Sequence, residues 1–169
     1  MPLLYLEFGV YGGRSISRMT ELFRHSQARF VGFDSFEGLP EDWAQAGTVK
    51  ERGFFSTQGR IPAISDPRVS FEKGWFQNTL PSFLAARNLK EPAPILVHYD
   101  ADLYSSTLFV LCMLWPVTTG YYFIFDEFMG DELLALDDFA RAFPVELEFL
   151  CSAGTYPAKV FGHMRRTTQ

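Results

Sequence analysis

The stretch Leu3-Leu-Tyr-Leu-Glu-Phe-Gly-Val-Tyr-Gly-Gly-Arg-Ser-Ile-Ser17 decides the fold of this chain. Its first part, 3–8, is an almost unbroken apolar and aromatic run, which predicts a strand covered on both faces. Three glycines follow, among them Gly9 and Gly13, and glycine serves where φ is positive or a ligand approaches the backbone closely. Apolar residues then recur at helical spacing, with Ser15 as the predicted N-cap. Strand, glycine turn and helix together are typical of a nucleotide-binding unit.

A carboxylate, Glu7, interrupts this apolar strand. Burying a carboxylate is costly unless a cation or a hydrogen-bond donor meets it. The dinucleotide-binding pattern Gly-x-Gly-x-x-Gly needs no acid at this place. An acid beside the turn suits a ligand that carries an ammonium group, and S-adenosylmethionine (SAM) is such a ligand. The alternative is a strand-end glutamate that lies in solvent or pairs with Arg14.

Composition and charge limit the function classes. With 169 residues, 47% of them hydrophobic and 17% aromatic, the chain is predicted to form one domain with a packed core. A net charge of −5 disfavours binding to nucleic-acid backbones. The longest apolar run, 108–117, is too short to span a bilayer, so no membrane partner is expected. Cys112 and Cys151 are predicted to be free thiols, and with no signal peptide this favours a cytoplasmic protein.

The second predicted strand, 29–34, ends in Asp34, which lies 22 residues after Gly12. An acid at about 20 residues beyond a glycine turn is the residue that hydrogen-bonds ribose hydroxyls in these folds. The alternative is a turn cap that Asp34 forms with Ser35. The long segment after it, 36–67, is rich in glycine and proline, and we interpret it as a lid beside the ligand.

Within that lid a helical turn over 41–46 is predicted. The third strand, 69–76, is ended by Gly74 and followed by a helix over 77–87, with Pro81 in its first turn. Trp75 and Phe76 are candidates to lie against a purine ring. The alternative is that at least one of these two side chains belongs to the core.

The fourth strand begins at Pro94 and ends in Asp100 and Asp102, which share one face if the strand continues through them. His98 has the same parity and is a candidate catalytic residue. The fifth strand, 120–128, again ends in acids, Asp126 and Glu127.

A helix over 131–143 follows, and two strands, 145–151 and 158–164, close the chain as an antiparallel hairpin. Five strand–helix units before a hairpin predict an α/β fold, Rossmann-like, with a mostly parallel sheet and helices on both faces. Right-handed crossovers place the first and fourth strands at the switch point, where α/β proteins bind ligands.

Five segments in order, 6–15, 32–40, 73–81, 98–107 and 125–128, resemble class I SAM-dependent methyltransferases of the macrocin O-methyltransferase type. The resemblance implies a three-layer sandwich around a seven-stranded sheet whose last strand is antiparallel. It implies one methyltransferase domain over the whole chain, without the cover helices that relatives carry before the first strand. A small-molecule acceptor and SAM are the implied partners, and a homo-oligomer is left open.

The resemblance also implies residue roles. Glu7, Gly9 and Ser15 would border the methionine part of SAM. Asp34 would hold the ribose hydroxyls, and Gly74, Trp75 and Phe76 would border the adenine. The expected cofactor-binding set also includes Gly13, Ser35 and Asp100. Asp100, Asp126 and Glu127 match positions where sugar O-methyltransferases bind Mg²⁺. Those relatives have two adjacent aspartates where this chain has Asp126-Glu127, and glutamate is also a hard-oxygen ligand.

The expected reaction is O-methylation of a small hydroxylated molecule of the sugar or natural-product type. Mg²⁺ would lower the pKa of the acceptor hydroxyl, and His98 or Asp100 would take the proton. Two alternatives stay open. One is a non-catalytic SAM-binding or scaffold protein with the same fold. The other is an NAD(P)-type oxidoreductase, which Glu7 and the missing Gly-x-Gly-x-x-Gly count against.

Overall fold

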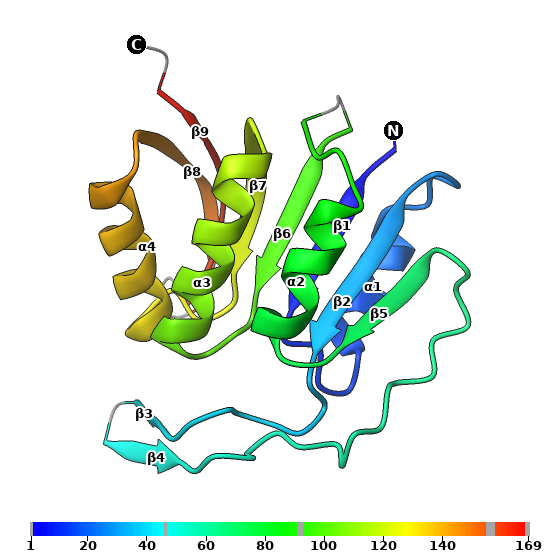
Figure 1. Ribbon diagram of the computed structural model, residues 1–169, viewed down its shortest axis with the longest axis vertical. Helices are drawn as coiled ribbons and strands as arrows, with labels where there is room; N and C mark the ends of the chain where they lie inside the picture. Colours follow the sequence, from blue (N-terminus) through cyan, green and yellow to red (C-terminus); the bar gives the residue numbers. More distant parts are fainter. Residues whose placement is uncertain (1, 46, 91–92, 155–157, 168–169) are drawn as a thin grey trace.

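The computed structural model describes residues 2–45, 47–90, 93–154 and 158–167. Seven strands form one sheet in the order β5-β2-β1-β6-β7-β9-β8 (Figure 1). The first five of these strands are parallel, while β9 is antiparallel to both of its neighbours. The strands are β1 (Leu4–Phe8), β2 (Arg29–Asp34), β5 (Val69–Lys73), β6 (Ile95–Tyr99), β7 (Gly120–Phe125), β8 (Val145–Ala153) and β9 (Lys159–Arg166). The predicted Rossmann-like seven-stranded sheet with an antiparallel end hairpin is confirmed.

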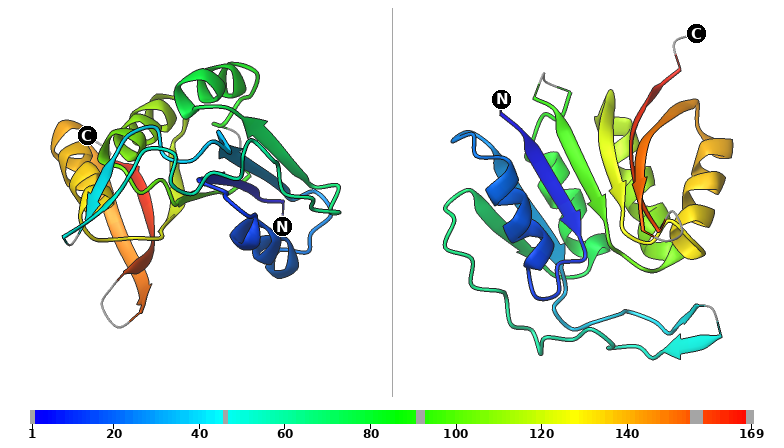
Figure 2. Two further views of the ribbon diagram at one scale, coloured as in Figure 1. Left: turned by 90° about the horizontal axis from the view of Figure 1, so that it is seen from below. Right: turned by 180° about the vertical axis from the view of Figure 1, so that it is seen from behind.

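The helices are shared unequally between the two faces of the sheet. Figure 2 shows α1 alone on one face and the other three α-helices on the opposite face. They are α1 (Arg14–Leu22), α2 (Phe76–Ala85), α3 (Tyr104–Leu114) and α4 (Asp131–Ala142), with a short 3-10 turn, η1 (Trp115–Val117), after α3. None of the described helices has the length and apolarity that crossing a membrane requires.

The central strands β1 and β6 are buried on both faces, which explains their continuous apolar sequences. Side chains alternate between the faces along each strand. Leu6, Phe8 and Val97 therefore pack in the cluster beneath α2, α3 and α4, whereas Tyr5 and Leu96 pack in the cluster beneath α1. The switch point between β1 and β6 lies where the sequence predicts it.

The segment after β2 differs from its prediction. Its described residues form no α-helix but a small hairpin of β3 (Trp43–Gln45) and β4 (Thr48–Lys50). The prediction of five strand–helix units is therefore wrong, as is the helical turn over 41–46, of which Ala46 lies outside the described residues. Trp43 is buried against Leu39 and Leu103, and this contact with a distant loop favours an extended backbone over a helical turn.

Three local predictions are also corrected. Gly13, in a left-handed conformation, is the N-cap of α1, and Ser15 lies inside the helix. Pro81 is the sixth residue of α2, which begins at Phe76, so it lies in the second turn and not in the first. Strand β6 ends at Tyr99, and Asp102 has a φ of 61°, so Asp100 and Asp102 do not share a strand face.

Candidate active site

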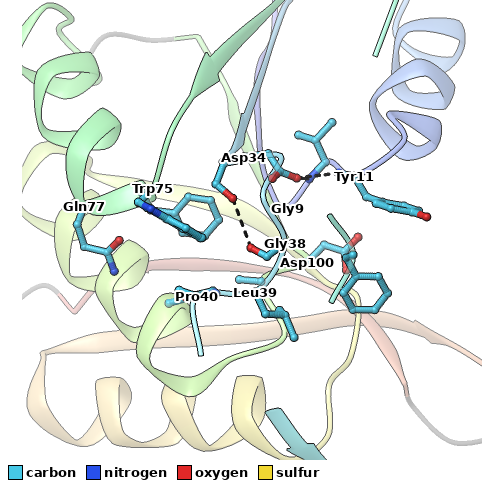
Figure 3. A pocket seen from close by; sticks show the side chains of 15 residues that line it. Gly9, Tyr11, Asp34, Gly38, Leu39, Pro40, Trp75, Gln77 and Asp100 are labelled. Carbon is cyan, nitrogen blue, oxygen red and sulfur yellow. Dashed lines mark hydrogen bonds between the residues drawn. The ribbon is translucent and has the colours of Figure 1, made fainter. Parts of the chain in front are cut away.

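A cavity opens at the carboxyl ends of β1, β2 and β6, beside the switch point (Figure 3). It combines the loop after β1, the start of the lid, the N-terminus of α2 and the loop after β6. The residues that line it are Gly9, Val10, Tyr11, Asp34, Ser35, Gly38, Leu39, Pro40, Phe55, Trp75, Phe76, Gln77, Asp100, Ala101 and Ser106. The structure thus brings together six of the predicted cofactor residues: Gly9, Asp34, Ser35, Trp75, Phe76 and Asp100.

Asp34 organises the glycine turn. Its Oδ2 accepts the backbone N–H groups of Val10 and Tyr11, each at 2.8 Å, and its Oδ1 accepts that of Phe36 at 2.6 Å. Figure 3 shows the bond to Tyr11 across the top of the cavity. The turn cap considered as an alternative is therefore present, and it coexists with a position on the cavity wall. Contact of Asp34 with a ribose stays a prediction.

The N-terminus of α2 supplies an aromatic wall. Trp75 is the N-cap residue of α2, directly after Gly74, whose φ is 145°. Phe76 lines the cavity and also packs edge-on against Phe8, with the ring centroids 5.3 Å apart. Phe76 is therefore partly a core residue, whereas Trp75 and Gln77 are the side chains that Figure 3 shows beside the open space. Gly74 itself is not a wall residue.

Glu7 lies behind this wall and not on it. Its side chain is 0% exposed, its Oε2 accepts the hydroxyl proton of Tyr5, and its Oε1 accepts that of Ser15 at 3.0 Å. It neither lies in solvent nor pairs with Arg14. Strand parity turns this side chain toward α1, on the same face of β1 as Tyr5. The contact of Glu7 with a ligand stays a prediction. Gly13 and Ser15 also lie outside the wall. The N–H of Gly13 donates to the carbonyl oxygen of Val10 within the turn.

Sequence reasoning missed several wall residues, namely Val10, Tyr11, Gly38, Leu39, Pro40, Phe55, Gln77, Ala101 and Ser106. Tyr11 and Phe55 both have positive φ, at 50° and 66°, and their rings contact each other edge to face. Val10 and Tyr11 lie inside the glycine turn, so their position was the signal that could have identified them. For Phe55 the sequence holds no local signal. It reaches the cavity through the path of the lid, and it is distant in sequence from the other wall residues.

The lid crosses the carboxyl ends of the strands (Figure 1). Several hydrogen bonds join it to the rest of the fold. Among them, Gln45 Nε2 donates to Glu127 Oε2 at 2.9 Å, Ser105 Oγ donates to Glu41 Oε1 at 2.6 Å, and Lys73 Nζ donates to the carbonyl oxygen of Gly59 at 2.7 Å. Within the lid the ammonium group of Lys50 lies over several aromatic rings, 4.1 Å from the ring centroid of Trp43.

Next to the cavity lies an acid cluster of His98, Asp100 and Asp126. One ligand atom from each residue lies within 4.8 Å of the others, and this is the group of potential metal ligands found among the described residues. His98 is 4% exposed, and its Nδ1 lies 2.7 Å from the hydroxyl oxygen of Tyr5. Its Nε2 lies 3.5 Å from Asp126 Oδ1 and has no hydrogen-bond partner among the described residues. Lys159 also pairs with Asp126.

The charges of this cluster are strongly coupled. Burial lowers the pKa of His98, but the carboxylates of Asp126 and Glu7 outweigh burial and raise that pKa to about 9. Burial and the nearby Asp126 raise the pKa of Asp100 to about 6. Burial alone would raise the pKa of Asp126, but His98 and Lys159 together lower it to about 2. Near neutral pH the cluster therefore holds a charged imidazolium between ionised acids.

Glu127 lies outside this cluster, and the predicted metal set of Asp100, Asp126 and Glu127 stays a prediction. Its carboxylate accepts a hydrogen bond from Gln45 of the lid. The third member of the cluster, beside Asp100 and Asp126, is His98. Mg²⁺ is commonly held by one or two carboxylates and keeps several waters. Two converging carboxylates, Asp100 and Asp126, fit that requirement, and the orphaned Nε2 of His98 lies beside them.

Comparison with known proteins gives the following matches. Residues 2–147 match the model of the family described as Macrocin-O-methyltransferase (TylF). The chain is 31% identical over 144 residues to the 8-demethyl-8-(2,3-dimethoxy-alpha-L-rhamnosyl)-tetracenomycin-C 4'-O-methyltransferase of Streptomyces olivaceus, covering 75% of this chain and 53% of that protein. It is 30% identical over 148 residues to the demethyldecarbamoylnovobiocin O-methyltransferase of Streptomyces niveus, covering 73% and 52%. The chain thus spans about half the length of these relatives.

Among solved structures, that of cmcI with Mg and SAM is similar, with a TM-score of 0.57 and 20% identity. The match covers 99% of this chain and 66% of that chain. At this identity the likeness shows a shared fold, and it agrees with the strand order described above.

Proposed function

This chain belongs to the macrocin O-methyltransferase family, and we propose that it transfers the methyl group of SAM to a hydroxyl oxygen of a small, sugar-like or natural-product acceptor. One observation carries the proposal. The glycine turn after β1, the acid that ends β2 and the aromatic residue that begins α2 line a single cavity at the switch point. That is the place where open α/β sheets bind their ligands.

The cavity has groups suited to each part of the cofactor. Trp75 offers an aromatic face for the adenine. A carboxylate has about four acceptor sites, and Asp34 uses three of them for backbone N–H groups. One site is left, which suffices for a ribose hydroxyl. Gly9 lets the methionine part approach the backbone, and Asp100 is the second acid among the described wall residues.

Methyl transfer from a sulfonium requires alignment of the acceptor oxygen with the methyl group and removal of the hydroxyl proton. We assign the proton to Asp100 rather than to His98. Asp100 lines the cavity, and with a pKa of about 6 it is mostly ionised at neutral pH. His98 lies behind the wall between Glu7 and Asp126 and is already protonated there. Its positive charge, together with that of Lys159, lowers the pKa of Asp126.

A Mg²⁺ ion would be held by Asp100 and Asp126, and when bound it would lower the pKa of the acceptor hydroxyl. The cmcI structure with Mg and SAM supports this assignment by its fold alone. Binding of the ion by Asp126 would require the ion pair between Lys159 and Asp126 to break.

The test uses the purified chain and S-adenosylhomocysteine (SAH), the product of SAM-dependent transfer. Isothermal titration calorimetry should show SAH binding by the wild type and by Glu146→Gln, a control at an exposed ion pair of β8. Methylation of a panel of sugar-bearing phenolic compounds with labelled SAM, with and without Mg²⁺, then tests the reaction. Folded protein that binds no SAH would defeat the proposal.

A second candidate function is SAM binding without catalysis. The observation in its favour is that Lys159 and Gln45 already engage Asp126 and Glu127. Such a protein would bind SAH in the same titration but would leave every acceptor unmethylated at any Mg²⁺ concentration. Family membership favours either of these functions over the nicotinamide-dependent oxidoreductase considered from the sequence.

A further inference from the structure

Glu132, in the first turn of α4, is a buried carboxylate that the proposed reaction does not use. Its side chain is 1% exposed. Its Oε1 accepts the backbone N–H of Ala101 at 3.1 Å, and its Oε2 accepts that of Glu127 at 3.2 Å. No ion pair to it is found among the described residues. The two donors belong to different loops, one after β6 and one after β7.

These two loops carry the acids of the site. Ala101 follows Asp100, and Glu127 follows Asp126. The ladder between β6 and β7 pairs its last residues at Tyr99 and Phe125, and the N–H of Asp126 donates to the carbonyl oxygen of Tyr99 just beyond it. Past this point the strands no longer hold the loops together. The carboxylate of Glu132 continues the connection where the ladder stops.

The arrangement has an energetic cost that a purely structural side chain would avoid. Burying a carboxylate without a cation is unfavourable, and an apolar side chain of similar volume would often pack with equal or greater stability. Burial raises the pKa of Glu132 well above its ordinary range, although the two backbone N–H groups act in the opposite direction. Its place in the first turn of a helix offsets part of the cost.

We propose that Glu132 is a positioning residue, which joins the loop after β6 to the loop after β7 and thereby sets the separation of Asp100 and Asp126. This rests on the proposed function, in which those two acids act on the acceptor hydroxyl and hold the cation. Glu132 itself touches neither cofactor nor acceptor.

The test compares Glu132→Gln with Asp131→Asn in the whole chain. The amide of Glu132→Gln keeps the shape and one acceptor oxygen, but its NH₂ group faces the second backbone N–H. Asp131→Asn removes the neighbouring first-turn acid of α4, which makes no side-chain hydrogen bond to the described part of either loop. NMR measures the hydrogen-exchange rates of the backbone amides of Ala101 and Glu127. Electron paramagnetic resonance measures the affinity for Mn²⁺ alone as the cation probe. Calorimetry measures SAH binding.

In Glu132→Gln we expect at least one of the two amides to exchange about 10-fold faster, as for one lost hydrogen bond. Mn²⁺ affinity should fall by about 10–100-fold, the usual effect of losing an outer-shell partner. SAH affinity should stay within about threefold because the glycine turn and Trp75 are untouched. Asp131→Asn should match the wild type in all three measurements.

Two results for Glu132→Gln would overturn the proposal. One is an unchanged exchange rate at both amides. The other is faster exchange together with a Mn²⁺ affinity equal to that of the wild type. A wild type that binds SAH but no Mn²⁺ removes the cation from the proposed function, and the amide comparison then decides the role of Glu132 alone. If Glu132→Gln does not fold, the wild type decides: fast exchange of both loop amides in the native protein contradicts the proposal.

Discussion

The carbonyl oxygen of Asp100 lies 1.8 Å from the point that a Cβ atom on Gly9 would occupy. Gly9 also has a φ of +94°, which side chains rarely tolerate. The loops after β1 and β6 therefore touch backbone to backbone. This contact brings the acid of one loop to the glycine turn of the other.

Gly9→Ala should consequently destabilise the protein. Strain at positive φ and overpacking against backbone each contribute about 1–3 kcal/mol, so we expect a loss of about 2–4 kcal/mol in the free energy of unfolding. Urea denaturation measures it. Gly12→Ala is the matched control, because a Cβ there meets nothing within 4 Å. Equal stability of the two variants would contradict the packing described here.

Asp34→Asn should weaken SAH binding by at least about 10-fold. The amide nitrogen cannot accept a backbone N–H, so one side of the glycine turn loses charge-assisted bonds that are each worth about 1.5–3 kcal/mol. Calorimetry with SAH measures the effect. Ser35→Ala, which removes a hydroxyl from the adjacent wall position, should change the affinity less. The reverse order of the two effects would argue against Asp34 as the organiser of the turn.

Tyr5→Phe should lower the free energy of unfolding by about 1–3 kcal/mol, because it leaves buried polar groups of Glu7 and His98 without their shared hydroxyl. The ring shape is kept, so packing changes little. Tyr122→Phe on the exposed face of β7 is the control and should cost less than about 0.5 kcal/mol. Chemical denaturation at neutral pH compares the two variants.

The pH dependence of stability should show the raised pKa of Asp100. The folded value of about 6 lies above the ordinary 3.8, so the native state binds the proton more tightly than the unfolded state. Stability contributed by this proton is present below pH 3.8 and is lost as pH rises through 6. A shift of about 2 units corresponds to about 3 kcal/mol. The unfolding free energy of the wild type, minus that of Asp100→Asn, should fall by up to this amount from pH 4 to 6. A difference that does not change with pH would contradict the burial of Asp100.

Glu127→Gln should leave Mn²⁺ affinity within about threefold, whereas Asp126→Asn should reduce it by more than about 10-fold. The reason is that Glu127 faces Gln45 of the lid, while Asp126 faces Asp100 and His98. Electron paramagnetic resonance of Mn²⁺ measures both variants. A large loss in Glu127→Gln would restore Glu127 to the set of ligands that the sequence suggested.

Much of the fold was predictable from local pattern. The run 29–34 has the same bounds as β2, because an apolar stretch closed by an acid marks a buried parallel strand and its end. The lid hairpin was not predictable, since Trp43 is extended through its contact with Leu103, sixty residues away. Ser15 was misjudged for a similar reason. Its local preference is an N-cap, but its hydroxyl meets Glu7 across the turn.

The amino-acid sequence alone determined the seven strands of the main sheet, the switch point and the list of acids and glycines at strand ends, because periodicity and turn chemistry are local properties. Only the tertiary structure decided which of those acids face the cavity. Glu7 and Asp34 both lie at the carboxyl end of a strand. Glu7 turns toward α1, where it binds Tyr5 and Ser15, whereas Asp34 turns toward the glycine turn. The direction of a side chain at a strand end depends on parity and on neighbours from other strands, which are distant in sequence.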